Sequence, residues 1–259
     1  YQALDDAMQK KIFGSAGTKV VIEDFLEGEE ASFIVLCDGK KTIPFASSQD
    51  HKARDNNDLG PNTGGMGAYS PAPIVTEEIH KQVMEKIIKP TIDGLKSEGI
   101  TYKGFLYAGL MIKNSEISVL EFNCRFGDPE TQPILMRMES DLAEICLLAA
   151  QGNLNEREIS WTKDSALGVV IASKGYPFEY EKNKEINNLE NENSRQKVFH
   201  AGTKTQEGKV LSNGGRVLCV TALGSTLLDS KNLAYQKVKN IDWKDGFYRD
   251  DIGDKAIKS

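Results

Sequence analysis

The chain has 259 residues, of which 39% are hydrophobic and 27% are charged. This balance is typical of a globular protein with one large or two ordinary domains. Acidic residues outnumber basic ones by 38 to 32, and the net charge of −6 argues against a protein held to nucleic acid mainly by phosphate contacts. No apolar run reaches the length of a membrane span, so we expect no membrane partner.

The cysteines indicate the compartment of the protein, and the first residue bears on the extent of the chain. Cys37, Cys124, Cys146 and Cys219 each lie in an apolar run and form no C-x-x-C pair. This pattern predicts buried free thiols in a reducing compartment, and therefore a cytoplasmic protein. The chain begins at Tyr1 within what reads as a polar helix, so we expect a piece of a longer protein.

The first part of the chain reads as a helix, a strand and a hairpin, followed by a long loop. Asp38-Gly39 is a favoured two-residue turn between the strands of the hairpin. Segment 47–73 has no periodicity and holds four glycines, and a loop of this length inside a compact domain is usually functional or disordered. The predicted elements are a helix over residues 3–13, a strand over 19–26, and the paired strands 30–37 and 42–46.

Helices and a second hairpin follow the loop. Thr76 is predicted to cap a helix that Pro90 kinks or breaks. Residues 104–112 are apolar enough for a buried strand, which would pair with a strand from Glu116 onwards. A further helix is predicted to begin at Asp141. We therefore expect an α+β unit over residues 1–155.

The rest of the chain, 156–259, is predicted to form a smaller β-rich domain. The polar stretch 153–164 contains its boundary with the first unit. Thr226 is expected to cap its final helix. The charged insert 181–196 reads as an exposed loop whose role stays open. The predicted strands of this domain cover residues 166–172, 197–200, 209–211 and 216–222.

One predicted strand carries an unusual polar face. Side chains alternate along a strand, so Glu121, Asn123 and Arg125 lie on one face, about 7 Å apart in succession. The apolar residues between them are expected to bury against a core. Carboxylate and amide oxygens suit Mg²⁺, and arginine suits a phosphate or acyl phosphate. The alternative is a surface strand with a solvated polar face.

This strand resembles a known family. Glu-x-Asn-x-Arg on a late strand is similar to the metal-binding signature of ATP-grasp enzymes, and the run 121–132 resembles the phosphoribosylamine–glycine ligases in particular. The resemblance includes runs 197–203, 213–224 and 248–253, and it is weakest over 181–196. The family also has an upstream part with a phosphate-binding lysine and a glycine-rich loop. Only its later part is resembled here, so the missing amino-terminal part is an expected partner.

The resemblance implies a fold and a reaction. The fold would be the C-terminal lobe of an ATP-grasp domain, an antiparallel sheet with helices, followed by a small β-rich domain. The reaction would use ATP with Mg²⁺ or Mn²⁺ to phosphorylate glycine. The amine of 5-phosphoribosylamine would then attack the glycyl phosphate, giving glycinamide ribonucleotide, ADP and phosphate. The metal ligands would be Glu121 and Asn123.

The resemblance also implies an adenine hinge, where an acidic turn follows a predicted strand. Acidic turns are common in proteins, so the residues alone leave this open. The implied nucleotide contacts are Glu23, Asp24, Phe25 and Leu26 at adenine and Glu29 or Glu30 at ribose.

The acceptor substrates are assigned to the glycine loop and to the turn after the metal strand. Glycines let a backbone approach a ligand and present N–H groups as an anion nest, although a flexible loop has the same composition. Arg125 and Asp128 are the expected catalytic residues; simple loop capping is the alternative for Asp128. The expected substrate contacts are Asp50, Lys52, Asn62, Thr63, Gly64, Gly65, Met66, Gly67, Glu130 and Thr131.

Two rival functions remain at this point. One is another ATP-grasp ligase or carboxylase with a different acceptor. The other is a non-catalytic nucleotide-binding module. The pattern of residues does not determine the oligomeric state or the preferred metal.

Overall fold

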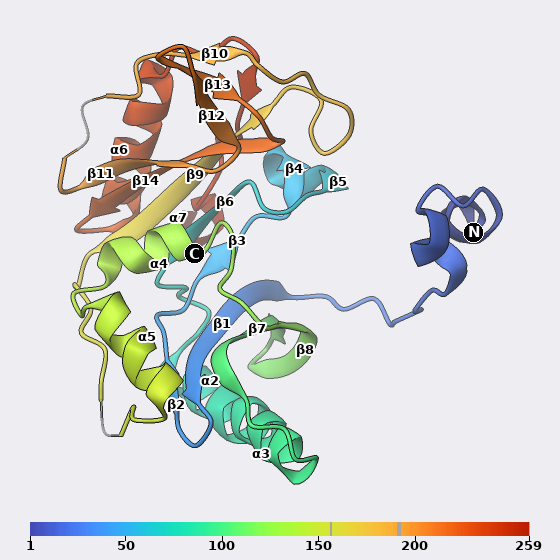
Figure 1. Cartoon of the computed structure of the whole chain (residues 1–259), viewed down its shortest axis with the longest axis vertical. Coiled ribbons are helices and arrows are strands. Elements are labelled where there is room, and N and C mark those ends of the chain that lie inside the picture. Colours follow the sequence, from blue (N-terminus) through green and yellow to red (C-terminus); the bar gives the residue numbers. More distant parts are fainter. Residues whose placement is uncertain (156, 191–192, 259) are drawn as a thin grey trace.

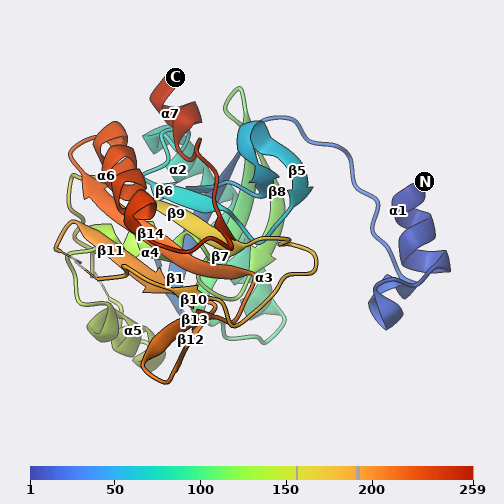
Figure 2. The same ribbon diagram turned by 90° about the horizontal axis from the view of Figure 1, so that it is seen from above.

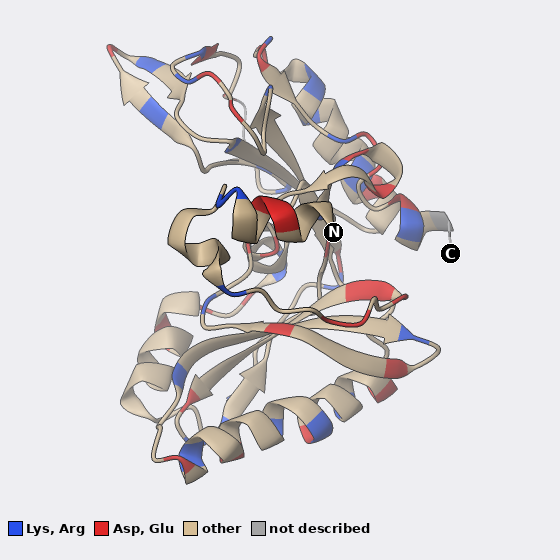
Figure 3. Ribbon diagram, turned by 90° about the vertical axis from the view of Figure 1, so that its right-hand side faces the viewer, with Lys and Arg blue, Asp and Glu red and all other residues tan. Residues whose placement is uncertain are grey.

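The computed structural model describes residues 1–155, 157–190 and 193–258 (Figure 1). The first 28 residues form an arm that projects away from the rest of the molecule (Figures 1 and 2). Seen from the side, this arm lies in front of the junction between the two main sheets (Figure 3). Its elements are the helix α1 (Gln2–Leu4), the π-helix η1 (Asp5–Gln9) and the 3₁₀ helix η2 (Gly14–Thr18).

Two predictions for the arm need correction. The predicted helix over 3–13 is helical only as far as Gln9. The predicted strand over 19–26 is absent, and Val21 and Ile22 are 85% and 80% exposed. Apolar residues there suggested a strand, but no neighbouring strand lies beside this segment to pair with its backbone.

The first main sheet is antiparallel and contains the predicted hairpins. Its strand order is β2-β1-β7-β8, so the long strands β1 and β7 are central. As predicted, a turn at Asp38-Gly39 joins β1 to β2 in one hairpin, and a turn at Asn114-Ser115 joins β7 to β8 in the other. The bounds are β1 (Glu29–Asp38), β2 (Thr42–Pro44), β7 (Lys103–Lys113) and β8 (Glu116–Asn123).

Both faces of this sheet are covered along most of β1. Phe33 and Val35 pack in the core under the helices α2 (Glu77–Val83), η4 (Met84–Ile88) and α3 (Lys89–Ser97). Ile34 and Leu36 face the opposite core, which includes α5 (Leu142–Gln151). Strand alternation explains the split. On this second face, Ser32 stands in place of an apolar side chain near the start of β1, and the polar site begins there.

The predicted helix signals are confirmed. The Thr76 hydroxyl accepts from the Ile79 N–H at 3.3 Å and caps α2. The expected break at Pro90 is an exception, because residues 77–97 are helical throughout, with the π-helix η4 directly before α3. Asp141 caps α5, and the capping box of Thr226 and Asp229 begins α6 (Leu227–Asn240).

The second main sheet joins strands from both halves of the sequence. Its order is β11-β14-β9-β6-β3, and β15 pairs with the other end of β9. The two strands β3 and β6 precede residue 155, whereas the rest follow it, so the two units share one sheet. The bounds are β3 (Gln49–Asp50), β6 (Gly67–Ser70), β9 (Ser165–Ser173), β11 (Gln196–His200), β14 (Arg216–Gly224) and β15 (Gly246–Phe247).

Shorter elements complete the fold, and sequence periodicity missed most of them. In the described part of the chain, no helix has the length and apolar character needed to cross a membrane. The remaining elements are β4 (Ala53–Asp55), η3 (Asn56–Asp58), β5 (Leu59–Asn62), α4 (Thr131–Arg137), β10 (Glu185–Ile186), β12 (Thr203–Gln206), β13 (Lys209–Ser212) and α7 (Asp254–Lys258).

The cysteines and the back of β8 differ from expectation. Cys37 and Cys219 are buried free thiols as predicted, but Cys124 is exposed. Phe122, on the predicted apolar face of β8, is 43% exposed. The reason is that β8 is the edge strand of its sheet, so the cover over the central strands does not fully reach it.

Candidate functional site

A cavity of 530 Å³ opens where the arm enters β1. It brings together two groups of residues that are separate in the sequence. The predicted adenine hinge contributes from one side and the predicted substrate loop from the other. Lining residues relevant to these predictions are Phe25, Leu26, Glu29, Glu30, Asp50, Lys52 and Asn62, joined by Met111 and Lys255.

The hinge has its side chains at the cavity but is not a strand. Phe25 and Leu26 line it, whereas Glu23 and Asp24 lie further back along the arm and are exposed. The Gln49 amide donates to the Glu30 carbonyl at 2.9 Å and to Glu29 Oε2 at 3.4 Å. The start of β1 is therefore fixed to β3 at the cavity edge.

Lys52 is the main cation beside these acids. Its Nζ lies 2.6 Å from Glu30 Oε2. Burial alone would lower the pKa of Lys52, but the carboxylates of Asp50 and Glu30, with a smaller contribution from Glu121, outweigh burial and raise it. Lys52 therefore stays protonated and is suited to an anionic ligand group.

Behind Lys52 lies a buried acidic network. Burial, followed by the nearby charge of Glu130, raises the pKa of Asp50. Glu130 is only 3% exposed, and its Oε1 accepts from the Ser32 hydroxyl at 2.8 Å. The Ser32 hydroxyl is also 2.9 Å from the Tyr107 hydroxyl. The expected substrate contact at Glu130 stays a prediction, and in this structure the carboxylate is held inside the protein.

The predicted metal ligands share one face of β8. Glu121 pairs with Gly109 and Asn123 with Tyr107, and Asn123 Nδ2 lies 3.1 Å from Glu121 Oε1. A Cβ at residue 109 would lie 3.2 Å from Glu121 Cγ, so glycine gives this side chain room over the sheet. These oxygen donors fit Mg²⁺ or Mn²⁺, because Mg²⁺ commonly takes one or two protein ligands and leaves the rest to water and phosphate. Among the described residues, no group of three or more His, Cys, Asp or Glu is arranged so that it could hold a metal ion by itself.

The two predicted catalytic residues differ in their surroundings. Arg125 is exposed, and its Nη1 donates to the Phe126 carbonyl at 2.9 Å. Asp128 has a 54% exposed side chain, and its Oδ2 accepts from Arg216 Nη2 at 3.1 Å. Arg216 belongs to β14 in the C-terminal part, and sequence reasoning did not assign it to the site.

The backbone N–H groups of the glycine loop, expected to form an anion nest, bond within the protein. The Gly64 N–H donates to the Tyr176 hydroxyl at 2.9 Å, and the Gly65 N–H donates to Thr63 Oγ1 at 3.0 Å. The Met66 N–H donates to the His51 carbonyl at 2.8 Å. These donors already have protein acceptors, so the glycines serve close packing instead.

Three further expected substrate contacts are buried or already bonded within the protein. Met66 is fully buried in the C-terminal core. Gly67 is buried within β6, where a Cβ would lie 2.7 Å from the Gly168 carbonyl oxygen. The Thr131 hydroxyl donates to the Gly127 carbonyl at the start of α4. The roles of these three residues at a ligand stay predictions.

Arg249 is a second long-range residue that sequence reasoning missed. It is 2% exposed, and it donates to both oxygens of Asp251 at 2.8 Å. Its Nη1 also donates to the Ala53 carbonyl and to Asp58 Oδ1, both at 3.0 Å. Lys255, which lines the cavity, pairs with the same Asp58. The C-terminal tail thus holds the loop that carries Lys52.

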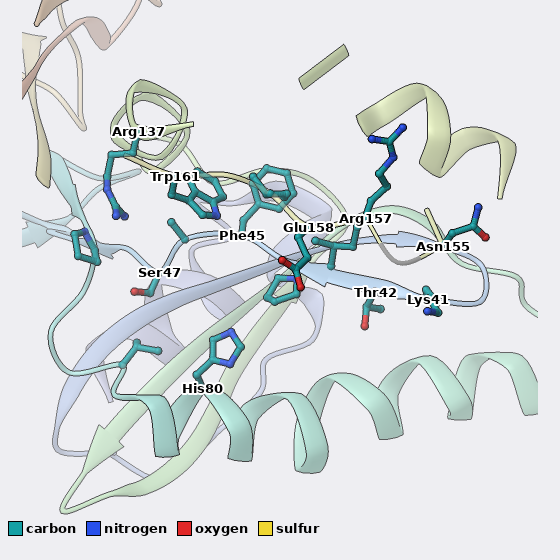
Figure 4. Close-up of a pocket in the computed structure, with 16 residues that line it drawn as sticks. Lys41, Thr42, Phe45, Ser47, His80, Arg137, Asn155, Arg157, Glu158 and Trp161 are labelled. Carbon is teal, nitrogen blue, oxygen red and sulfur yellow. The ribbon is translucent and has the colours of Figure 1, made fainter. Parts of the chain in front are cut away.

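A second cavity of 660 Å³ lies beside the edge strand β2 and contains none of the predicted site residues. Figure 4 shows His80 pointing into it below Glu158, with Phe45 and Trp161 above. The Arg137 guanidinium at its margin already donates to the Ser70 hydroxyl at 2.9 Å and to the Asp164 carbonyl at 2.8 Å. Its greater volume does not make it the site, because its charged groups do not converge on one position.

Known proteins match both halves of the chain. The family model "Phosphoribosylglycinamide synthetase, ATP-grasp (A) domain" matches residues 1–131, and the model of the C domain of the same synthetase matches residues 166–255. The phosphoribosylamine–glycine ligases of Allochromatium vinosum and Pasteurella multocida are 56% and 53% identical to 98% of this chain. The chain spans about 60% of the length of these relatives.

Solved structures agree with the family models. A phosphoribosylamine–glycine ligase from Thermotoga maritima is 32% identical and superposes with a TM-score of 0.85, covering 97% of this chain and 63% of that one. The biotin carboxylase domain of a thermophilic 2-oxoglutarate carboxylase has a TM-score of 0.64 at 13% identity, over 95% of this chain and 54% of that one, and shows the fold alone. Since the ATP-grasp model alone matches half of the residues, this chain belongs to the phosphoribosylglycinamide synthetase family.

Proposed function

We propose that this chain forms the nucleotide, metal and acceptor part of an enzyme that joins glycine to 5-phosphoribosylamine. ATP phosphorylates the glycine carboxylate, and the amine of 5-phosphoribosylamine then displaces phosphate. The products are glycinamide ribonucleotide, ADP and phosphate. The observation that carries this proposal is the 530 Å³ cavity, where the hinge residues Phe25 and Leu26 meet the loop residues Asp50 and Lys52.

The nucleotide is assigned to the cavity at the start of β1, and the metal to the polar face of β8, where the charge of Glu121 helps to raise the pKa of Lys52. Adenine packs against Phe25 and Leu26, and Glu29 accepts from ribose. Glu121 and Asn123 hold Mg²⁺ or Mn²⁺, which neutralises charge on the transferring phosphoryl group when it is bound. Arg125 donates to the same phosphoryl group or to the acyl phosphate, as a charge-assisted donor.

The acceptor side is assigned to the turn after β8 and to Lys52. The exposed carboxylate of Asp128 holds the ammonium of glycine. Asp128→Asn should therefore raise KM for glycine by about tenfold or more, since a hydrogen bond to a charged group is worth about 1.5–3 kcal/mol. The Kd for ATP should stay unchanged. Equal losses of glycine use and ATP binding would show that Asp128 only supports the turn.

Release of ADP by the cytoplasmic enzyme that contains this chain tests the reaction. We expect ADP release that requires both glycine and 5-phosphoribosylamine, and glycinamide ribonucleotide as the product. Other amino acids and other amines are the matched controls. Equal stimulation by a different acid or amine would indicate another ATP-grasp ligase, and ATP binding without turnover would indicate a binding module.

A further inference from the structure

Arg216 lies at a point where three distant segments meet. It is the first residue of β14, and its side chain is 22% exposed. Nη1 donates to the Gly64 carbonyl at 2.6 Å and to the Asp128 carbonyl at 2.7 Å. Nη2 donates to Asp128 Oδ2 at 3.1 Å. One guanidinium thus holds the glycine loop and both the backbone and the carboxylate of Asp128.

The segments around Arg216 fit closely. A Cβ at residue 64 would lie 2.9 Å from Arg216 Cζ, and a Cβ at residue 65 would lie 2.4 Å from Pro129 Cδ. Gly65 also has a φ of +114°, which only glycine adopts readily. The two glycines therefore let the loop pack directly against the arginine and against the turn after β8.

We propose that Arg216 is a positioning residue that acts through Asp128. Nη1 and Nη2 already donate to oxygens of the glycine loop and of Asp128, so we assign Arg216 to fixing this carboxylate and not to contacting substrate. The C-terminal domain thereby sets the geometry of the acceptor side. This inference rests on the proposed function, because it takes Asp128 as the group that holds the glycine ammonium.

If Arg216 had a purely structural role, its loss would affect stability and not specifically the use of glycine. An ion pair to a carboxylate that is 54% exposed contributes little to stability. A misplacement of about 1 Å in a binding group, however, can reduce turnover about a hundredfold. Lysine keeps the charge of arginine, but its single ammonium cannot bridge the Gly64 carbonyl, the Asp128 carbonyl and the Asp128 carboxylate. The conservative variant should therefore fail to restore glycine binding.

The test compares Arg216→Gln and Arg216→Lys with Asp128→Asn and the double variant Arg216→Gln/Asp128→Asn in the same enzyme. Lys209→Gln is the control, since it removes an exposed ion pair with Glu185 on a different sheet of the C-terminal part. Both Arg216 variants should raise KM for glycine about tenfold or more, while Kd for ATP changes less than about twofold. The double variant should be no worse than Asp128→Asn alone. Equal changes in KM and Kd, additive effects in the double variant, or normal KM in Arg216→Lys would overturn the proposal.

Amide hydrogen exchange separates this inference from the proposed function. Without any substrate, Arg216→Gln should speed exchange at Gly64, Gly65 and the 128–131 turn but not in β1. Unchanged exchange there would overturn the positioning role even in an active enzyme. If the unaltered enzyme shows no glycine-dependent ADP release, the proposed function fails, and with it the role of Arg216 in glycine binding.

Discussion

Acid should destabilise this protein through His51. The ring is 5% exposed, its Nε2 accepts from the Gly253 N–H at 3.3 Å, and its Nδ1 has no hydrogen-bond partner among the described residues. Burial lowers its pKa from 6.5 to about 4. The charges of Arg249 and Lys255 reinforce this shift, and those of Asp58 and Asp251 oppose it in part. The folded protein therefore holds His51 neutral where the unfolded chain binds a proton.

The sign and size of the effect follow from linkage. Because the folded pKa is depressed, the stabilisation is fully present above pH 6.5 and is lost as the pH falls towards 4. Each pKa unit is worth about 1.4 kcal/mol, so His51 accounts for a loss of about 2 kcal/mol of unfolding free energy by about pH 5 and about 3 kcal/mol by about pH 4.

Denaturant unfolding across this pH range measures the effect. On going from neutral pH to pH 5 and pH 4, His51→Gln should lose less unfolding free energy than the unaltered protein by these amounts. This holds whatever the variant does to stability at neutral pH. The control is His200→Gln, which removes an exposed histidine and should leave the slope unchanged. A wild-type slope in His51→Gln would refute the reasoning.

Three further predictions concern the metal strand, the hinge and the tail. Glu121→Gln and Asn123→Ala should each raise the Mg²⁺ concentration needed for half-maximal ADP release by about tenfold or more; near-normal activity at low Mg²⁺ in both variants would remove the assignment. A nucleotide-bound structure should place adenine against residues 23–26, and adenine elsewhere would exclude the hinge. Arg249→Met should cost about 3 kcal/mol of unfolding free energy, because it leaves Asp58 and Asp251 without their buried partner. Lys209→Gln, at an exposed ion pair, should cost less than about 1 kcal/mol, and equal losses in the two variants would contradict the buried role.

Local patterns in the sequence predicted the elements that local physics determines. Apolar runs identified β1 and β7, and the cap residues Thr76, Asp141 and Thr226 marked the starts of their helices. The face shared by Glu121 and Asn123 followed from strand alternation alone. These features depend on neighbours within a few residues, so periodicity and capping chemistry are sufficient to predict them.

Features that depend on distant partners could not be predicted in this way. Arg216 bonds to a residue 152 positions away, and Arg249 to one 196 positions away. No period or turn signal records such pairings. Strands as short as β3 and β6 were missed for the same reason, because they exist by pairing with each other and β6 with β9. Glycine content likewise does not say where N–H groups find acceptors, and those of Gly64, Gly65 and Met66 find theirs within the protein.

Two buried or half-buried arginines of the C-terminal part hold the loop that we assign to the acceptor side. Arg249 holds the start of the 51–67 segment through the Ala53 carbonyl, and Arg216 holds its end through the Gly64 carbonyl. Lys52, directly before Ala53, and Asn62, two residues before Gly64, reach the cavity. Glu121 and Asn123, in contrast, are positioned by β7 within the first sheet. Changes in the C-terminal domain should therefore disturb the 51–67 segment before they disturb the metal strand, because the segment bonds to Arg216 and Arg249 whereas the metal strand pairs within the first sheet.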